Sequence, residues 1–324
     1  MEFNGSLFVQ YLIIGIASGG LIALIALGYT LVYGIVELIN FAHGEVFMMG
    51  AFLALSVVGL AGINADSSWG AIAGVALLGL AAAMLFSALI NAGIDRIAYR
   101  RLRNAPRLAP LIAAIGFSFI LQNIGIYWLG ANPVTAPTLI PTEYRAFNVL
   151  TEWFGFDTRI RLRIIDIAVI GIAIPLLAFL TWFVYKTRTG KAMRAVAQDR
   201  EAAALMGIDI NRTITTAFLL GGALAGAAGM IALFYNNAAR FQMGFRYGLF
   251  AFTAAVLGGI GNLSGAVLGG LLIGIVWALS DGFMKEYIPA WGAQWTPAVI
   301  FGVLVIVMVF KPSGLLGEQT ADKV

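Results

Sequence analysis

The stretch APLIAAIGFSFILQNIGIYWLG, residues 109–130, contains no charged side chain. A helix needs about 20 consecutive apolar residues to cross roughly 30 Å of hydrocarbon, and this stretch meets that length. Residues 164–185 and 299–310 form further runs with almost no charge. The sequence therefore predicts a helical protein that crosses a membrane several times.

The composition of the whole chain supports this prediction. Of its 324 residues, 60% are hydrophobic and 11% are charged, whereas an average soluble domain has about 45–50% apolar and about 25% charged residues. A compact globular protein of this size could not bury so many hydrophobic residues. This excludes a soluble enzyme or a soluble binding module. The chain has no cysteine and one histidine, His43, so thiol chemistry and a multi-histidine metal site are excluded, and we expect no cofactor on this chain.

Eight hydrophobic segments are long enough to be membrane spans. They lie near residues 7–33, 44–60, 69–94, 108–130, 164–185, 213–235, 247–281 and 295–311. The seventh is too long for one straight span and is interrupted at residues 258–262, which predicts a broken or re-entrant helix. The first run is too long for a signal peptide and follows no basic stretch, so we expect it to remain as a span. The predicted fold is an all-α, polytopic bundle that forms one transmembrane domain over residues 1–324.

Basic residues orient the bundle, because cytoplasmic loops are enriched in lysine and arginine. One basic loop holds Arg96, Arg100, Arg101, Arg103 and Arg107, and a second, within 186–212, holds Lys186, Arg188, Lys191, Arg194, Arg200 and Arg212. Both are predicted to be cytoplasmic, which accounts for the net charge of +4 without nucleic acid as a partner. The N-terminus and the 131–163 connection are then external, although Arg159, Arg161 and Arg163 depart from the rule. The C-terminus is cytoplasmic if the seventh segment enters and leaves on one side.

Glycines recur at a spacing of four residues, which lets helix backbones approach closely in lipid. The pairs are Gly15/Gly19, Gly222/Gly226, Gly265/Gly269 and Gly270/Gly274. Together they predict a tightly packed bundle and carry no information about a substrate.

Residues 34–46 are unusually polar for a membrane protein, with Glu37, Asn40, His43 and Glu45 between two apolar runs. In one interpretation this is an interfacial loop, in which Asn40 caps the next helix and Glu45 lies in its first turn, where the helix dipole favours an anion. In the other it is a re-entrant stretch that lines a polar cavity, since irregular backbone is tolerated at membrane depth only there.

Residues 256–270 place Asn262 and Ser264 after three glycines inside an apolar stretch. Asn262–Gly265 loosely repeats Asn40–Gly44, and glycine-interrupted segments in corresponding halves indicate a translocation site near the bilayer midplane. A packing kink is the alternative.

Two amides, Gln122 and Asn123, lie well inside the opening stretch, where buried amides usually bond across helices. Contact with a substrate is the other interpretation. The candidate residues of a substrate path are thus Asn40, His43, Glu45, Gln122, Asn123, Asn262 and Ser264.

Residues 194–209 predict a short helix in the second basic loop. Asp199 is a suitable N-cap, residues 200–206 would form two turns, and Gly207 would end them. A small apolar surface is then expected from Ala202, Ala203, Leu205 and Met206. It could dock a partner, or it could lie on the protein itself or on lipid. No phosphate-binding glycine loop and no catalytic cluster stands out, so we do not expect an enzyme.

Four stretches make the sequence similar to a known family: INFAHGE at 39–45, DREAAALMGI at 199–208, AAVLGGIG at 254–261 and FKPSGLLG at 310–317. In these it resembles the permease subunits of branched-chain amino acid ABC importers, the LIV type. The resemblance covers nearly the whole chain, although the 131–163 connection looks longer than in the family. Glu201-Ala202-Ala203 followed by Gly207 is similar to the EAA-x3-G core by which importer permeases dock an ATPase, without the proline that usually follows.

The resemblance implies a transport subunit in the bacterial inner membrane that hydrolyses no ATP itself. It also implies a second homologous permease, two cytoplasmic ATPases and an external solute-binding protein as partners, with lipid around the bundle. The substrate would be a branched-chain or related neutral amino acid, and a permease for urea or short amides is the alternative. An ion-coupled secondary transporter usually needs charged residues within its spans, and these runs are nearly bare of charge.

Overall fold

The computed structural model describes residues 5–103, 105–106, 108–139, 146–147, 160–288 and 290–317. Asn104 and Arg107 of the first basic loop, and residues 140–145 and 148–159 of the predicted external connection, lie outside this part of the chain. The long helices are α1 (Gly5–Val36), α2 (His43–Ala61), α3 (Trp69–Ile94), α5 (Leu108–Leu129), α7 (Ile164–Lys186), α10 (Ile210–Asn236), α11 (Met243–Gly258), α12 (Leu263–Ala278) and α14 (Thr296–Phe310).

Shorter elements connect these helices. They are the π-helical turns η1 (Asp95–Tyr99) and η3 (Leu279–Phe283), the 3-10 turn η4 (Ala293–Trp295), and the helices α4 (Arg100–Leu102), α8 (Arg188–Gln198), α9 (Arg200–Leu205) and α13 (Met284–Tyr287). Four two-residue strands pair antiparallel, β1 (Val134–Thr135) with β4 (Ala238–Ala239) and β2 (Ala146–Phe147) with β3 (Leu162–Arg163).

The predicted all-α membrane fold is confirmed. Over the described residues, eight helical stretches are long and apolar enough to cross a membrane, and α11 is a shorter apolar helix. The predicted seventh segment divides into α11 and α12, with the break at residues 259–262. Asn262 ends the break, because its side chain accepts a hydrogen bond from the backbone of Gly265 at 2.9 Å and so starts a new helix.

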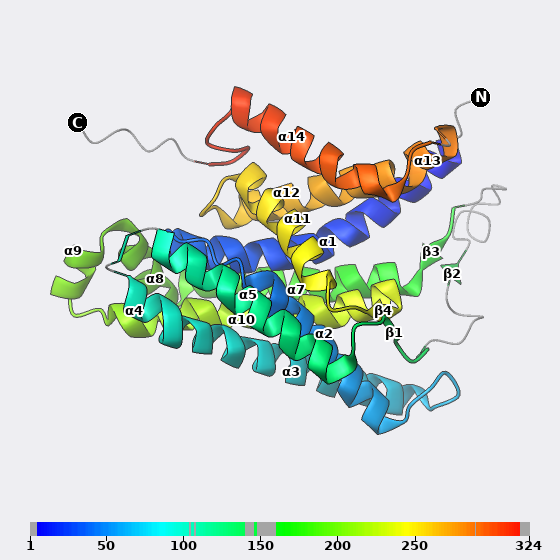
Figure 1. Ribbon diagram of the computed structural model, residues 1–324, viewed down its shortest axis with the longest axis horizontal. Coiled ribbons are helices and arrows are strands. Elements are labelled where there is room, and N and C mark those ends of the chain that lie inside the picture. The colour runs from blue at the N-terminus through cyan, green and yellow to red at the C-terminus, as the bar shows by residue number, and fades with distance from the viewer. Residues whose placement is uncertain are drawn as a thin grey trace.

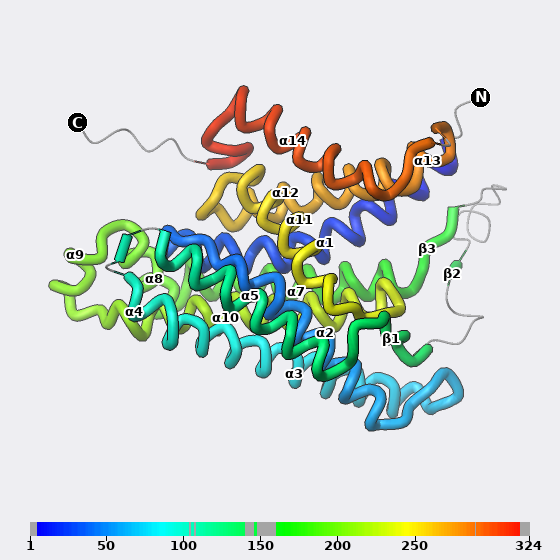
Figure 2. Tube along the Cα trace, in the orientation of Figure 1, coloured from blue at the N-terminus to red at the C-terminus, as the bar shows by residue number. Residues whose placement is uncertain are grey.

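The helices of the two basic loops and the four short strands lie at opposite ends of the molecule. In Figure 1, α4, α8 and α9 lie at one end together with the last turn of α14, whereas α13 and the four strands lie at the other. The tube in Figure 2 follows α1 from the strand-bearing end toward the basic end. Both basic loops therefore share a side, as the orientation from charge requires.

Helices α1, α2, α10 and α11 form the centre of the bundle and are buried over most of their length. Close packing at this centre depends on the predicted glycine pairs. A Cβ atom added to Gly19 would lie 2.7 Å from the Cα of Leu271, and one added to Gly270 would lie 2.6 Å from the Cα of Ala23, both across the contact between α1 and α12. Any side chain larger than hydrogen would push these backbones apart.

The segments that follow α1 and α10 share a local backbone geometry, and these two helices run in opposite directions (Figure 2). Glu37 after α1 and Asn237 after α10 both have positive φ, 56° and 54°, and no other described non-glycine residue does. The next helix begins six residues later in each half. The amide of His43 donates to the carbonyl of Asn40 at 3.0 Å, and that of Met243 donates to the carbonyl of Arg240 at 3.1 Å.

The geometric counterpart of residues 37–46 is therefore 237–246, and not the stretch at 262–265 that the sequence suggested. The register is an offset of 200 residues, which pairs Phe41 with Phe241 and Gly44 with Gly244. Opposed repeats of this kind bring their irregular segments together inside a transporter.

Candidate functional site

The first irregular segment, residues 37–42, folds back into the bundle. Helix α2 starts beside Gly28, because a Cβ atom at Gly28 would lie 2.6 Å from Cε1 of His43. Gly28 is eight residues before the end of α1, which corresponds to about 12 Å of helix. Of the two interpretations left open by the sequence, the geometry favours the re-entrant one.

Asn40 holds this re-entrant segment in place. It is buried, and its amide donates to Oδ1 of Asn91 on α3 at 3.0 Å. Asn91 in turn donates to the carbonyl of Phe218 on α10 at 2.7 Å, and the hydroxyl of Tyr99 donates to the carbonyl of Ile39 at 3.0 Å. Asn40 also accepts from the amide of Ala42, which is the N-cap position. The bonds of Asn40 therefore hold the backbone of the re-entrant segment against α3.

Glu45 lies in the first turn of α2, where the sequence placed it, and is 1% exposed. Its Oε1 accepts a hydrogen bond from Gln122 on α5 at 2.7 Å and a longer one from Ser118 at 3.4 Å. Its Oε2 lies against Gly244 in the first turn of α11 and has no partner among the described residues. The carboxyl group therefore stands where the positive ends of two helices meet.

His43 packs inward against α1 instead of toward solvent. Its ring meets Tyr29 edge-to-face at 4.7 Å between centroids, and it is 1% exposed. His43 is therefore buried against α1 and does not line the cavity that is described next.

A cavity of about 770 Å³ opens between α5, α12 and the segment that joins α10 to α11. Its lining combines aromatic and polar side chains: Phe119, Gln122, Asn236, Ala238, Arg240, Phe241, Gln242, Met243, Phe245, Arg246, Tyr247 and Trp277. Gln122 thus connects the buried Glu45 to this cavity.

Arg240 and Arg246 were missed as site residues, because we expected the seventh segment to begin at residue 247. The offset of 200 residues from the polar segment 37–46 is the signal that could have found them. The pairing of β1 with β4 holds the outer side of their loop.

Of the seven predicted path residues, Gln122 lines this cavity and Glu45 bonds to Gln122 from behind. Asn40 and His43 are buried against other elements, and the remaining three lie elsewhere. Asn123 is exposed, and its amide returns to the carbonyl of Phe119 in its own helix at 2.8 Å. Asn262 caps α12 and donates to the carbonyl of Leu316 in the C-terminal tail at 2.8 Å, and Ser264 is exposed next to it. Asn262 lies beyond the far end of α11, roughly 20 Å of helix from the first turn that contacts Glu45.

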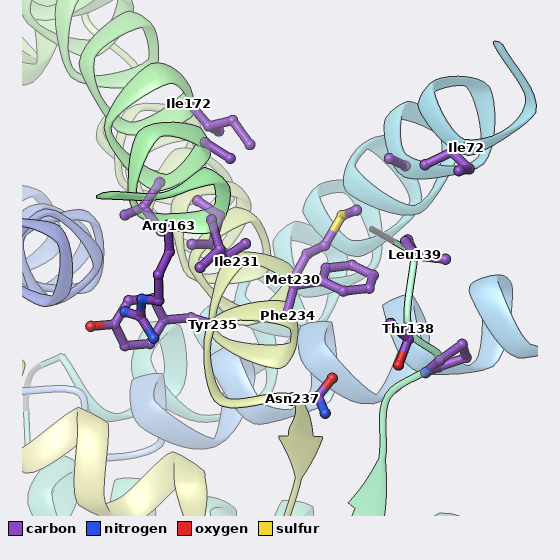
Figure 3. Close-up of a pocket in the computed structure, with 15 residues that line it drawn as sticks. Ile72, Thr138, Leu139, Arg163, Ile172, Met230, Ile231, Phe234, Tyr235 and Asn237 are labelled. Atoms are coloured by element: carbon purple, nitrogen blue, oxygen red, sulfur yellow. The ribbon is translucent and has the colours of Figure 1, made fainter. Parts of the chain in front are cut away.

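A second cavity, of about 410 Å³, lies near the strand-bearing end between α3, α7 and α10 (Figure 3). Arg163 reaches over the ring of Tyr235 at 4.8 Å and pairs with Asp166 at 2.6 Å. Burial disfavours the charged guanidinium, but the bonds from Arg163 to Asp166 outweigh it and raise the pKa of Arg163 above its ordinary value. Its charge is therefore already neutralised, and the rest of the wall is mostly apolar.

The predicted short helix in the second basic loop is α9. Asp199 accepts from the amide of Ala202 at 3.0 Å, which is the N-cap bond. Gly207 has a φ of 81°, and the amide of Ile208 donates to the carbonyl of Ala203, so the helix ends in a Schellman motif. The helix is one residue shorter than predicted, with Met206 at the C-cap.

The apolar surface of α9 differs from the predicted one in one residue. Leu205 and Met206 are 89% and 83% exposed, and Ala202 and Glu201 are exposed as well, whereas Ala203 is buried against the protein. On the inner side of the helix, Arg200 donates to the carbonyls of Ile35 and Val36 at 3.0 and 2.8 Å. These are the last carbonyls of α1, directly before the re-entrant segment.

Curated proteins of similar sequence are known for almost the whole length of this chain. The chain is 36% identical over 322 residues to the high-affinity branched-chain amino acid transport system permease protein BraD of Pseudomonas aeruginosa, covering 98% of each chain. It is 36% identical over 321 residues to LivH, the permease protein of the same description in Escherichia coli, again over 98% of each. Among solved structures, PsaBC from Streptococcus pneumoniae in complex with Fab aligns over 94% of this chain and 92% of that one, with a TM-score of 0.46 and 14% identity.

The sequence profile of one family, described as branched-chain amino acid transport system / permease component, matches residues 11–309. This match spans both irregular segments, the large cavity and α9. The chain belongs to the family of branched-chain amino acid transport system permease components.

Proposed function

We propose that this chain is the membrane-spanning subunit of an ATP-driven importer for branched-chain or related neutral amino acids in a bacterial inner membrane. The observation that carries the proposal is the 36% identity to BraD and LivH over 98% of the chain. In this account the chain provides half of the path and hydrolyses no nucleotide, and separate ATPase subunits supply the energy.

A second, homologous permease would close the path. The large cavity is open, and aromatic side chains at its wall stay exposed, with Phe119 at 60% and Phe245 at 61%. Exposed aromatic groups around a polar cavity are typical of a surface that another protein covers. An external solute-binding protein would deliver the amino acid to this cavity.

The ATPase would dock at α9. Leu205 and Met206 provide exposed apolar contacts there, and Arg200 connects the helix to the end of α1. Because α1 leads directly into the segment that carries Asn40 and Glu45, a shift of α9 would reach the path through covalent and hydrogen-bonded contacts.

Affinity purification of the chain from its native membrane tests the proposal. We expect a related permease and ATPase subunits to co-purify, and leucine uptake in the intact cells to be inhibited by excess valine and isoleucine. An ATPase-free preparation, or uptake inhibited by urea or acetamide and not by valine, would contradict it.

A further inference from the structure

The large cavity contains two cations whose negative partners are not in the described chain. Arg240 and Arg246 both line it, and the guanidinium group of neither makes a salt bridge or hydrogen bond with a described residue. The guanidinium of Arg246 lies over the ring of Trp277 at 5.3 Å and near the ring of Phe250 at 5.9 Å. Aromatic faces attract a cation but do not neutralise its charge.

Two carboxyl groups lie on adjoining elements, and each makes a hydrogen bond elsewhere, although Oε2 of Glu45 has no partner among the described residues. Glu45 is buried behind Gln122, which already donates to it at 2.7 Å. Asp281 accepts from the indole of Trp277 at 3.4 Å and lines a neighbouring cavity of about 330 Å³. Both arginine residues are exposed in the described chain, at the wall of the cavity. The two arginines therefore give the large cavity a positive character that is available to a solute.

The backbone adds to this positive character. Arg246 lies in the first turn of α11, a helix of 16 residues whose N-cap residue, Gln242, makes no side-chain cap bond. The amino end of such a helix favours an anion. The bond pair between Asn236 and Tyr247, at 2.8 and 3.1 Å, fixes the adjacent wall.

The remaining wall offers apolar contacts. Phe119, Phe241, Met243 and Phe245 surround the polar groups, and about 770 Å³ falls within the range of roughly 300–1,000 Å³ that small-molecule sites occupy. Such a cavity suits a small molecule with a carboxylate at one end and an apolar side chain at the other. Arg246 would attract the carboxylate, and the aromatic and aliphatic side chains would contact the apolar end.

We propose that this cavity is a transit site in the permease itself, in which Arg246 binds the α-carboxylate of a neutral amino acid and Arg240 adds to the attraction. This inference rests on the proposed function and goes beyond it, because selectivity for a carboxylate would then lie in the permease as well as in the solute-binding protein. Arginine suits the task, since its planar fork binds a carboxylate through two parallel hydrogen bonds.

The test uses the complete transporter with its binding protein in proteoliposomes that contain ATP. Arg246→Gln should lower the rate of leucine uptake at least roughly tenfold, which corresponds to about 1.4 kcal/mol, and Arg246→Lys should retain part of it. Arg96→Gln removes the same charge from η1 at the basic end and should transport like the wild type.

A binding measurement on the purified wild-type transporter, without the binding protein, covers the case in which the variant does not fold. We expect it to bind radiolabelled L-leucine, with displacement by unlabelled leucine and not by leucinamide, which lacks the carboxylate. Uptake at the wild-type rate in Arg246→Gln, or equal displacement by leucinamide, would overturn the transit site and leave the importer intact. Absence of ATP-driven leucine uptake by the wild type would instead overturn the proposed function.

Discussion

Arg200 provides the sharpest test of how helix α9 acts on the path. Its guanidinium donates to the carbonyls of Val36 at 2.8 Å and Ile35 at 3.0 Å. The last carbonyls of a helix have no partner within the helix, and the negative end of its dipole favours a cation there. Arg200→Gln would remove the charge and both bonds while leaving the exposed Leu205 and Met206 unchanged.

The size of the effect follows from these contacts. Hydrogen bonds that involve a charged group contribute about 1.5–3 kcal/mol to stability. Arg200 is half-buried, so water replaces part of the loss, and about 2 kcal/mol is the expected weakening of the contact between α9 and α1. This corresponds to a factor of roughly 30 in the population of the connected state.

The assay is the number of ATP molecules hydrolysed per leucine imported in proteoliposomes. Arg200→Gln should keep its ATPases and its hydrolysis but import much less leucine per ATP, by a factor between about 5 and 30. Arg194→Gln is the matched control. It removes the same charge from α8, where the guanidinium of Arg194 donates to the carbonyl of Tyr185 and lies over its ring.

A wild-type ratio of ATP to leucine in Arg200→Gln would refute this reasoning. An equal loss of coupling in Arg194→Gln would also refute it, because the effect would then come from the charge of the loop and not from the contact with α1.

Three further perturbations test other parts of the structure. Because the chain has no cysteine, Thr189→Cys should resist an impermeant thiol reagent in intact cells while Asp66→Cys reacts, and the reverse pattern would invert the orientation. Gly207→Val places a β-branched residue at a φ of 81°, which costs about 1–2 kcal/mol, and it should release the ATPases or uncouple hydrolysis. Gly207→Asn is the control, because asparagine tolerates that conformation. If Gly207→Val matches the wild type in pull-down and ATPase measurements, α9 has no docking role. Gly274→Val drives a side chain into the backbone of Gly19 and should lower the melting temperature of the purified protein. At Gly116 an added Cβ meets no atom of a neighbouring element within 4 Å, so equal melting of Gly274→Val and Gly116→Val would rule out the α1–α12 contact.

The sequence predicted those features that depend on local patterns. Apolar runs predicted the spans, the glycine spacing predicted the close contacts, and the Asp199-to-Gly207 pattern predicted α9 with its caps, because caps and helix packing are determined within a few residues. The position of Glu45 in the first turn of α2 was predictable for the same reason.

Contacts between distant parts of the chain were not predictable in this way. Arg200 meets Val36 across 164 residues, and the Glu45–Gln122 bond joins residues 77 apart. The depth of Arg246 depends on where α11 begins within the bundle, which a hydropathy pattern does not report. Asn123 and Asn262 were assigned to the path because both are polar in apolar runs, but each satisfies its bonds locally, one in its own helix and one as a cap.

In the proposed function, this chain forms part of an importer driven by ATP. Accumulation of radiolabelled leucine in proteoliposomes, reconstituted with the co-purified subunits and the solute-binding protein, tests it most directly. We expect leucine to accumulate against its gradient only when both ATP and the binding protein are present, and to do so even when ion gradients are dissipated. Accumulation that follows an imposed proton or sodium gradient without ATP would contradict it.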